Sequence, residues 1–246
     1  MLITTPAVVL QAFPYGDTSR ILRLATPDHG VQSVIAKGAM RPRSPFGGRL
    51  QVLSEGVAQF YHRPTRDLHT LAGFDVTDQH AALAGDLRRF AAGTALAELV
   101  LRTAHEEPQP LVFAVLAGTL NALAAAAPDR VGLVALAGLW HAVIVLGFAP
   151  TVDQCVRCGQ PLDDRAWFAL AEGGLLCAAC GRGTGTGTLG ADDQAALRAF
   201  LEGSEPGVDL PGPHVAAHRR LLARFVRRHV ADEAPLPALA FWETVG

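Results

Sequence analysis

Short apolar runs separated by turn-forming segments fill the first 79 residues of the chain. The separating segments are rich in Pro, Gly and Asp, which turn a chain by fixing or freeing φ. The five runs, each of strand length, are 7–13, 20–26, 31–37, 50–62 and 68–77. The Ser-Glu-Gly sequence at 54–56 interrupts the longest run, as a bulge or a sharp bend at a barrel corner would. Five strands predict a small closed barrel of the OB-fold type, because a sandwich usually needs about seven.

The rest of the chain is rich in Ala and Leu and has mostly helical periodicity. The pattern predicts helices over 80–105, 111–126 and 131–148, with prolines at their boundaries. Two further helices are expected over 192–202 and 214–232, and a Pro-rich tail follows them.

Two of the expected helical segments are nearly uncharged. Residues 109–128 and 131–148 are each about as long as a membrane span. They contain Asn121 and His141 and are rich in Ala and Gly, and they lack a flanking basic cluster and an aromatic belt. We therefore expect an apolar helical pair at the centre of a soluble bundle, and no contact with a membrane.

The four cysteines form two CxxCG pairs with 18 residues between them. Zinc takes four thiolates tetrahedrally, and two residues between ligands allow one tight turn to bring both sulfurs to the ion. The spacing predicts one structural Zn²⁺ bound by Cys155, Cys158, Cys177 and Cys180. We expect Arg157 to offset part of the negative charge. The alternatives are redox chemistry, which would need a thioredoxin-like βαβ setting, and disulfides, which a reducing cytosol disfavours.

Charge is distributed unevenly along the chain. Half of the 246 residues are apolar and 18% are charged, which excludes intrinsic disorder, and the net charge of −2 does not indicate nucleic acid. The first 66 residues, however, hold eight basic and only three acidic side chains. The eight basic residues, which are the candidate DNA contacts, are Arg20, Arg23, Lys37, Arg41, Arg43, Arg49, Arg63 and Arg66.

A basic barrel of this kind would bind phosphates in a salt-dependent and largely sequence-independent way. Exposed rings among the charges would stack on unpaired bases. The rings in question are Phe13, Tyr15, Phe46, Phe60 and Tyr61. The alternatives are that these rings belong to the barrel core and that the basic run is a solvated loop.

The helix expected over 214–232 carries a second basic face. At 100° per residue its arginines fall within an arc of about 100°, opposite an apolar side. This stripe, formed by Arg220, Arg224, Arg227 and Arg228, is a candidate secondary surface for nucleic acid. The alternative is a solvated face with some arginines paired to carboxylates.

The composition and motifs together define the expected organisation. We predict an α+β protein with an N-terminal OB-fold β-barrel, a central and C-terminal α-helical domain and a zinc-finger insert. The expected domains are a nucleic-acid-binding barrel at 1–79, a helical domain at 80–150, the insert at 151–190 and helices that pack on the helical domain at 191–246. The sequence contains no Walker A loop, GxSxG or HExxH motif, so we expect no enzymatic activity.

Three motifs carry a resemblance to a known family. Residues 16–30 read GDTSRILRLATPDHG, residues 36–41 read AKGAMR and are followed by Ser44, and the CxxCG pairs lie far downstream. In this order the motifs resemble those of RecO, the bacterial recombination mediator of DNA repair, over the whole chain. The length and the preference for Arg over Lys are similar to those of the Deinococcus member.

The resemblance implies the same order of OB-fold, helical domain and zinc-finger insert. It also implies binding of single- and double-stranded DNA, annealing of complementary strands and, with RecR, loading of RecA onto strands covered by the single-stranded-DNA-binding protein (SSB). DNA contact is carried over to Lys37, Arg41 and Arg43 by the AKGxxR segment, and to Arg20 and Arg23 by the preceding motif. Further implied partners are the acidic C-terminal tail of SSB, which would dock in the helical domain, and RecF. Some family members lack the cysteines, so zinc would be part of the scaffold.

The leading hypothesis is therefore a non-catalytic DNA-annealing mediator in the cytoplasm, associated with the nucleoid, since the N-terminus lacks the features of a signal peptide. Two alternatives stay open. One is an RNA-binding zinc-ribbon factor, which would prefer RNA through its 2′-OH groups. The other is an adaptor whose barrel binds protein and shows no salt-dependent affinity for DNA.

Overall fold

The computed structural model describes residues 1–103, 105–184 and 187–246. Ala104 in the expected helix 80–105, and Gly185 and Thr186 in the expected insert, lie outside the described residues. The chain forms two compact units, unit 1 (Met1–Ala126) and unit 2 (Ala127–Gly246). Unit 1 joins the barrel to the first helices, and unit 2 contains the cysteines and the later helices. The four-domain division expected from the sequence stays a prediction.

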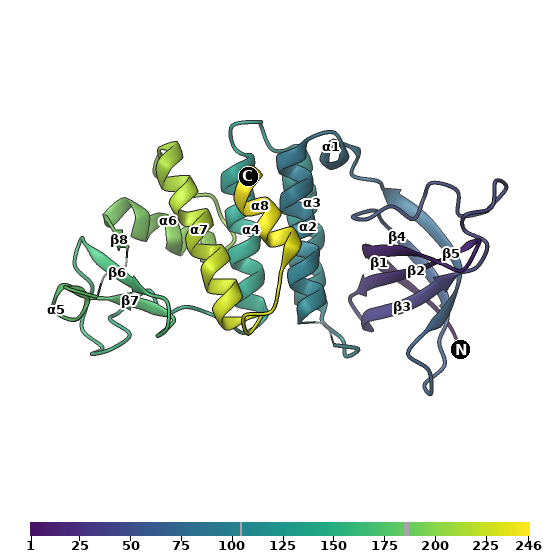
Figure 1. Ribbon diagram of the computed structural model, residues 1–246, viewed down its shortest axis with the longest axis horizontal. Helices are drawn as coiled ribbons and strands as arrows, with labels where there is room; N and C mark the ends of the chain where they lie inside the picture. Colours follow the sequence, from purple (N-terminus) through teal and green to yellow (C-terminus); the bar gives the residue numbers. More distant parts are fainter. Residues whose placement is uncertain (104, 185–186) are drawn as a thin grey trace. The chain divides into compact units, whose positions relative to one another are not determined.

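Unit 1 begins with five strands that close into a barrel. They are β1 (Leu2–Tyr15), β2 (Ser19–Thr26), β3 (Gly30–Ala36), β4 (Glu55–Tyr61) and β5 (His69–Asp78). Their order around the barrel is β1-β2-β3-β5-β4, and β4 pairs with β1 to close it (Figure 1). Only β3 and β5 run parallel. The predicted barrel of OB type is therefore confirmed.

The strand expected over 50–62 begins later than predicted. β4 begins at Glu55, and a register shift against β5 falls between Glu55 and Gly56, where the sequence indicated a bulge. The preceding residues are not extended, because Leu53 has a φ of +71° and its N–H donates to the carbonyl of Val9 (2.7 Å). The side chain of Leu53 is buried, so burial of this leucine outweighs strand propensity at this point.

The barrel core consists of side chains from alternate positions of the strands. Leu22 and Leu24 point inward from β2, while Arg23 between them lies on the outer side. The connection between β3 and β4 adds Phe46 and Leu50 to the same core. Each fully buried side chain of this size contributes roughly 1.5–3 kcal/mol, so the connection is held firmly against the barrel.

Three helices complete unit 1: α1 (Ala81–Ala84), α2 (Leu87–Arg102) and α3 (Pro110–Ala125). The single helix expected over 80–105 is interrupted before α2. Asp86 caps the N-terminus of α2, and its carboxylate accepts hydrogen bonds from the N–H groups of Arg88 (2.9 Å) and Arg89 (3.1 Å). A new cap starts a new helix, which explains the break.

Arg89 joins α2 to the end of α3. Its side chain is buried, and its guanidinium donates to the carbonyls of Leu123, Ala124 (3.1 Å) and Ala126 (2.7 Å). The last carbonyls of a helix have no partner within the helix, and a cation is favourable there. This contact could not be predicted from the sequence, because the partners are backbone atoms 34 to 37 residues further along the chain.

Unit 2 contains four longer helices: α4 (Val131–Val145), α6 (Ala191–Leu201), α7 (Gly212–His229) and α8 (Pro237–Val245). Contacts join α4 to α6 and α7, and α7 to α8 (Figure 1). Trp140 of α4 and Phe225 of α7 are both fully buried, with ring centroids 5.3 Å apart. The Pro-rich tail contains α8, because Pro237 is tolerated in a first helical turn and Trp242 is buried. None of the helices in the described ranges has the length and hydropathy needed to cross a membrane.

The cysteine-bearing segment of unit 2 forms a small antiparallel sheet. Its strands are β6 (Ala166–Ala169), β7 (Gly174–Leu176) and β8 (Thr188–Leu189), and the short helix α5 (Ala178–Gly181) follows β7. β6 pairs with both β7 and β8. An antiparallel sheet is not the βαβ setting of thioredoxin-like redox motifs.

In unit 1 the β2–β3 turn packs against the connection between α2 and α3. The N–H of Val31 donates to the carbonyl of His105 (2.9 Å), and the N–H of Gln109 donates to the carbonyl of Pro27 (3.0 Å). Gly30 lies in this turn with a φ of +60°, and a Cβ there would be 2.1 Å from the carbonyl oxygen of His105. Only glycine permits this approach, so the packing of the helices on the barrel depends on it.

Replacing Gly30 with Ala is expected to lower the free energy of unfolding by roughly 3 kcal/mol or more, because a left-handed φ and a backbone collision add together. Gly16→Ala is the matched control, since Gly16 has a φ of +57° and no atom within 4 Å of the new Cβ. The control should lose only about 1–2 kcal/mol. Urea denaturation of both variants measures the difference, and equal losses would show that the contact with His105 is unimportant.

Candidate metal centre and candidate nucleic-acid interface

Both CxxC pairs lie on tight turns that bring their sulfurs together. In the first, the N–H of Gly159 donates to the carbonyl of Cys155 (2.8 Å), and Gly159 has a φ of +71°. In the second, Cys177 precedes α5, and the N–H of Gly181 donates to its carbonyl (2.8 Å). The local structure therefore explains why a glycine follows each cysteine pair. Gly159 adopts the left-handed conformation, and a Cβ on Gly181 would lie 2.6 Å from the ring of Trp167.

The four sulfurs form a compact cluster. The Sγ atoms of Cys155, Cys158, Cys177 and Cys180 all lie within 4.8 Å of one another, and none of the four cysteines forms a disulfide. The sulfurs of Cys158 and Cys177 are 3.8 Å apart. Zinc–sulfur bonds of about 2.3 Å in a tetrahedron place ligand sulfurs about 3.8 Å apart. The four cysteines could thus hold a metal ion, as the spacing predicted.

The thiols of the cluster differ in acidity. Burial acts to raise the pKa of Cys155, but the backbone N–H groups of Cys177, Cys158 and Arg157 together lower it to about 6. The neighbouring thiols, first that of Cys158, raise the pKa of Cys180 to about 12. A first thiolate is therefore stabilised by backbone amides, whereas further thiolates repel it. A cation would remove this repulsion.

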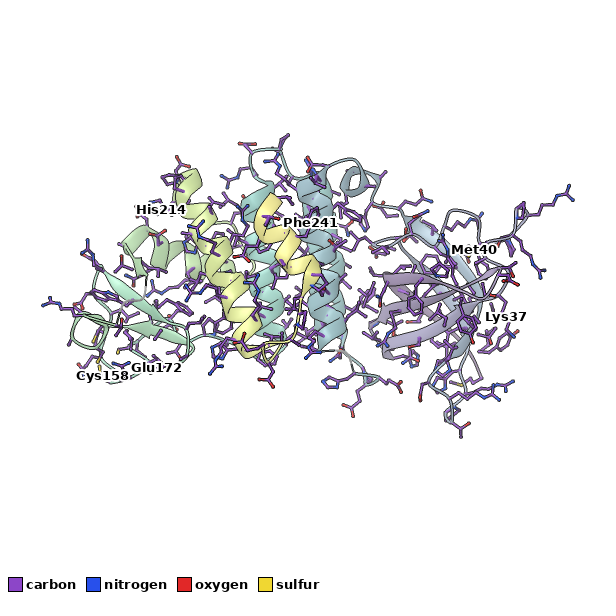
Figure 2. The ribbon with its side chains drawn as sticks, viewed as in Figure 1. Lys37, Met40, Cys158, Glu172, His214 and Phe241 are labelled. Carbon is purple, nitrogen blue, oxygen red and sulfur yellow. The ribbon has the colours of Figure 1, made fainter. Side chains whose placement is uncertain are left out.

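Arg157 lies beside the cysteines, where we expected it to offset negative charge, and it also makes two structural contacts. Its guanidinium forms an ion pair with the carboxylate of Glu172 (2.5 Å) and donates to the carbonyl of Cys180 (3.1 Å). The pairing raises the pKa of Arg157 and lowers that of Glu172. Figure 2 labels Glu172 and Cys158 in this segment. Because Glu172 compensates its charge, Arg157 acts mainly as a tie between the two turns.

The eight candidate DNA contacts of the barrel lie on three segments. Arg20 and Arg23 are half-buried in β2, while the other six are exposed. Those six are Lys37, Arg41, Arg43 and Arg49 between β3 and β4, and Arg63 and Arg66 between β4 and β5. Within the described ranges, none of the eight forms a salt bridge with a carboxylate. Their positive charge is therefore uncompensated.

The turn that carries Lys37 and Arg41 is anchored beside the start of β2. The N–H of Gly38 donates to Oγ of Ser19 (3.4 Å), and the N–H of Met40 donates to the carbonyl of Thr18 (2.8 Å). Figure 2 shows Lys37 and Met40 on the barrel. Gly38 has a φ of +69°, and the side chain of Arg41 passes close to its Cα, where a Cβ would lie 3.4 Å from Cδ. The backbone that carries the cations of this connection is thus held in place by hydrogen bonds to β2 and the turn before it.

Arg20 and Arg23 are on opposite faces of β2. Arg20 pairs with Ala36 and so lies next to the beginning of the basic connection, whereas Arg23 pairs with Ser33 on the outer face. The Nε of Arg23 is buried without a hydrogen-bond partner among the described residues. Arg63 and Arg66 come from a different loop.

The five aromatic residues of the barrel fall into two groups. Phe46 and Phe60 are core residues, 6% and 0% exposed, so they are unavailable to bases. Phe13, Tyr15 and Tyr61 are 38–53% exposed. Phe46 and Phe60 are therefore core residues, as the alternative interpretation expected, and stacking of bases on the other three rings stays a prediction.

The arginine stripe of α7 is also divided. Arg227 pairs with Glu243 of α8, and Arg228 lies 3.8 Å from Glu233. Arg220 and Arg224 are exposed and have no carboxylate partner within the described ranges. The pairing of some of these arginines, which the alternative interpretation expected, is confirmed for two of the four.

A pocket that the sequence did not indicate lies beside α7, with a cavity volume of about 400 Å³. It combines apolar walls with charged groups, because β6, α6 and α7 meet there. The apolar residues include Phe168, Leu170, Leu189 and Leu221, and the ionisable ones are Asp193, His214, His218, Arg220 and Arg224. Oδ1 of Asp193 contacts Nδ1 of His214 (2.9 Å) and Nε2 of His218 (3.2 Å).

These features define a class of protein: a closed five-stranded barrel with uncompensated basic loops, followed by helices and a four-cysteine centre. The family model "Recombination protein O N terminal" matches residues 1–80, and "Recombination protein O C terminal" matches residues 84–239. A DNA repair protein RecO of Anaeromyxobacter dehalogenans is 34% identical over 97% of this chain and 95% of its own length. The RecO of Salinibacter ruber is 33% identical over 95% of this chain and 90% of its own length. The chain therefore belongs to the RecO family.

The stability of the protein is expected to fall on acidification because of His218. Burial lowers the pKa of His218 below its ordinary value of 6.5, although Asp193 acts in the opposite direction. The unfolded chain then binds the proton more readily than the folded one, so stability is lost as the pH falls below about 6.5. His218→Gln, which keeps an N–H donor for Asp193, should flatten this dependence between about pH 7.5 and pH 5.

Urea denaturation of the wild type and the variant at a series of pH values tests this. Burial also lowers the pKa of His69, so part of the slope should persist in the variant. An unchanged slope in His218→Gln would assign the acid sensitivity to other groups.

Proposed function

We propose that this chain is a DNA-binding recombination mediator that binds single- and double-stranded DNA and anneals complementary strands. The observation that carries the proposal is the set of eight cations on an OB-type barrel, none of them paired with a carboxylate in the described ranges. Membership of the RecO family and the names of the relatives, which are DNA repair proteins, support it.

Annealing follows from charge neutralisation without a covalent step. Two complementary strands repel each other through their phosphates, and each Lys or Arg that meets a phosphate reduces this repulsion and releases counterions. Contacts to the backbone leave the edges of the bases free to pair. The role is non-catalytic, and it takes place in the cytoplasm, where the nucleoid is.

We further propose that the protein acts with RecR to load RecA onto DNA covered by SSB, and RecF is a further candidate partner. For the C-terminal tail of SSB, which the family resemblance implies as a partner, we propose the pocket beside α7. Its lining lies between residues 168 and 224, so this proposal places the docking outside the helical domain of 80–150 where the resemblance put it. Its apolar walls accommodate an apolar side chain, and Arg220 and Arg224 at the pocket complement acidic residues.

The four-cysteine centre is proposed to bind one structural Zn²⁺. The sulfur separation and the closed set of four thiolates suit zinc and leave no ligand position for a substrate. When bound, the ion would balance the thiolates of Cys155, Cys158, Cys177 and Cys180. Residues of the protein hold the two turns next to each other, because Arg157 donates from the first turn to the second and Trp167 packs on Gly181.

The purified chain is expected to contain about one zinc per molecule, and a chelator should lower its melting temperature, because metal-binding energy contributes to folding. Cys155→Ser should lose the metal. Gln160→Ala changes an exposed residue of the same turn and should retain it. Elemental analysis and thermal melts measure both quantities. A protein that contains no metal and melts identically with chelator would refute a zinc centre.

The DNA-binding proposal predicts that Arg41→Glu with Arg43→Glu weakens binding to single and double strands at least about tenfold and slows annealing. Each lost phosphate contact should reduce the salt slope by about 0.7 on single strands. Adding Lys37→Glu should lower the DNA affinity and the rate of annealing further. Fluorescence anisotropy at several salt concentrations and a strand-annealing assay measure these quantities.

The matched control is Arg165→Glu with Arg182→Glu, two exposed arginines of unit 2 outside both basic surfaces. It makes the same change in net charge and should leave binding nearly unchanged. Wild-type annealing by the Arg41/Arg43 variant would defeat the assignment. Competition between matched DNA and RNA oligonucleotides at two salt concentrations separates the alternatives: an RNA factor prefers RNA, and an adaptor shows no salt-dependent affinity for either.

A further inference from the structure

The pocket beside α7 and the four-cysteine centre share one small sheet. The pocket residues that belong to the cysteine-bearing segment are Phe168, Leu170, Gly187, Thr188 and Leu189, and the others lie on α6 and α7. The sheet contacts α5 through β6 and β7, and it contacts α6 through β8 (Figure 1). One wall of the pocket is therefore built from the same strands that adjoin the cysteines.

Strand β6 connects the two sites through neighbouring side chains. Trp167 packs on the backbone of Gly181, where an added Cβ would lie 2.6 Å from the ring, and it belongs to the apolar cluster around the cysteines. Phe168 lines the pocket, is 4% exposed, and has its ring centroid 6.1 Å from that of Phe225 in α7. Successive side chains of a strand point to opposite faces. A shift of β6 on the cysteine side would therefore move Phe168 in the pocket wall.

A buried amide provides a second connection. Gln194 of α6 is 4% exposed, and its Nε2 donates to the carbonyls of Asp163 (3.0 Å) and Leu189 (3.4 Å). The carboxylate of Asp163 accepts a hydrogen bond from the N–H of Ala178 (3.0 Å), which lies within the second cysteine turn. Gln194 thus links that turn to Leu189, a residue of the pocket wall.

The sheet has few other contacts that would hold it in place. β6, β7 and β8 contain four, three and two residues, and strands this short are unstable without packing on other elements. The buried cluster on the cysteine side consists of only Cys155, Ala169, Leu176 and Cys177 among the residues that the structure describes. The position of the sheet therefore depends strongly on whether the cysteine turns are held together.

We propose that the four-cysteine centre controls the affinity of the pocket for its peptide ligand, and that Trp167 and Gln194 transmit this control. A metal ion on the cysteines would fix both turns, so that Phe168 and Leu189 form an ordered wall. Without the ion, a ligand has to order this wall itself, which costs conformational entropy. The inference rests on the proposed function, which assigns Zn²⁺ to the cysteines and the acidic tail of SSB to the pocket.

The charged side of the pocket should be independent of the metal. Arg220 and Arg224 lie on α7, which is held by its contacts with α4 and α8. Their attraction for an acidic peptide should persist when the cysteines hold no ion. Loss of the metal is therefore expected to lower the peptide affinity by the same factor at every salt concentration, because only the apolar wall changes.

The first experiment uses the full chain in three states: loaded with zinc, stripped with a chelator, and stripped and then reloaded with Zn²⁺. The probe is a fluorescent peptide of the acidic SSB C-terminus, titrated by anisotropy at several salt concentrations. We expect the stripped chain to bind at least about fivefold more weakly with the same salt slope, and reloading to restore the affinity. Far-UV circular dichroism measures whether the stripped chain keeps its helices.

The second experiment uses the reciprocity of coupled sites. If the metal strengthens peptide binding by some factor, the peptide must strengthen metal binding by the same factor. Competition for zinc between the full chain and a chelator, with and without saturating peptide, measures this factor. The measurement starts from the loaded protein, so it decides the question even if stripping unfolds part of unit 2.

Variants test the two connecting residues. Gln194→Leu keeps the volume of the side chain but removes the donor, and it should reduce both coupling factors at least about twofold while the chain retains its zinc. Trp167→Ala should also reduce them, whereas Trp167→Phe should preserve them because a ring still packs on Gly181. The matched control is Ala195→Ser, which changes an exposed residue of α6 and should leave the coupling unchanged.

The possible failures are distinguishable. Equal peptide affinity of the loaded and stripped chains, or a zinc affinity that does not respond to the peptide, would refute the coupling and leave the zinc and pocket proposals intact. Unchanged coupling in both Gln194→Leu and Trp167→Ala would overturn their assigned role. If the loaded chain does not bind the peptide, or the purified chain holds no metal, that part of the proposed function fails and this inference fails with it. DNA binding by the barrel is tested separately by the Arg41/Arg43 variant.

Discussion

The closure of the barrel by β1 is the constraint on which the arrangement of unit 1 depends. The first half of this strand, from Leu2 to Val8, pairs with β4, and the second half, from Val8 to Tyr15, pairs with β2. A register irregularity between Val9 and Gln11 marks the change of partner, where a bulge lets a strand bend. Following the registered pairs once around the barrel leads from Leu2 to Phe13, so the strands are strongly staggered. This stagger decides which outer residues become neighbours.

The closed barrel also holds the segment that carries four of the basic residues. The connection between β3 and β4 is long, but Phe46 and Leu50 enter the barrel core and its backbone bonds to Ser19 and Thr18. Its cations are therefore held by the same core that stabilises the barrel. A ligand would meet charges whose backbone is already ordered, so binding loses less conformational entropy than it would with a free loop.

Unit 2 is stabilised in a different way around its cysteines. Its sheet has three very short strands, and too few apolar residues surround them for a large core. The turns are instead held by backbone hydrogen bonds, by Arg157 with Glu172, and by four sulfurs placed at ligand distance. Elsewhere in unit 2, Glu243 and Glu233 pair with arginines of α7. The barrel keeps its positive charge because, in the described part of the chain, none of its carboxylates forms an ion pair with the eight cations.

The sequence by itself determined the elements whose causes are local. Alternating apolar runs with turns between them predicted five strands, the CxxCG spacing predicted the cysteine cluster, and the charge count revealed the basic barrel. Tertiary structure decided everything that depends on residues far apart in the chain. Phe46 and Phe60 are buried, whereas Phe13 and Tyr61 are exposed. Arg89 donates to carbonyls at the end of α3. The pocket lies where β6, α6 and α7 meet. The stagger of the closed barrel belongs to the same group, because it is a property of the whole pairing pattern and of no single segment.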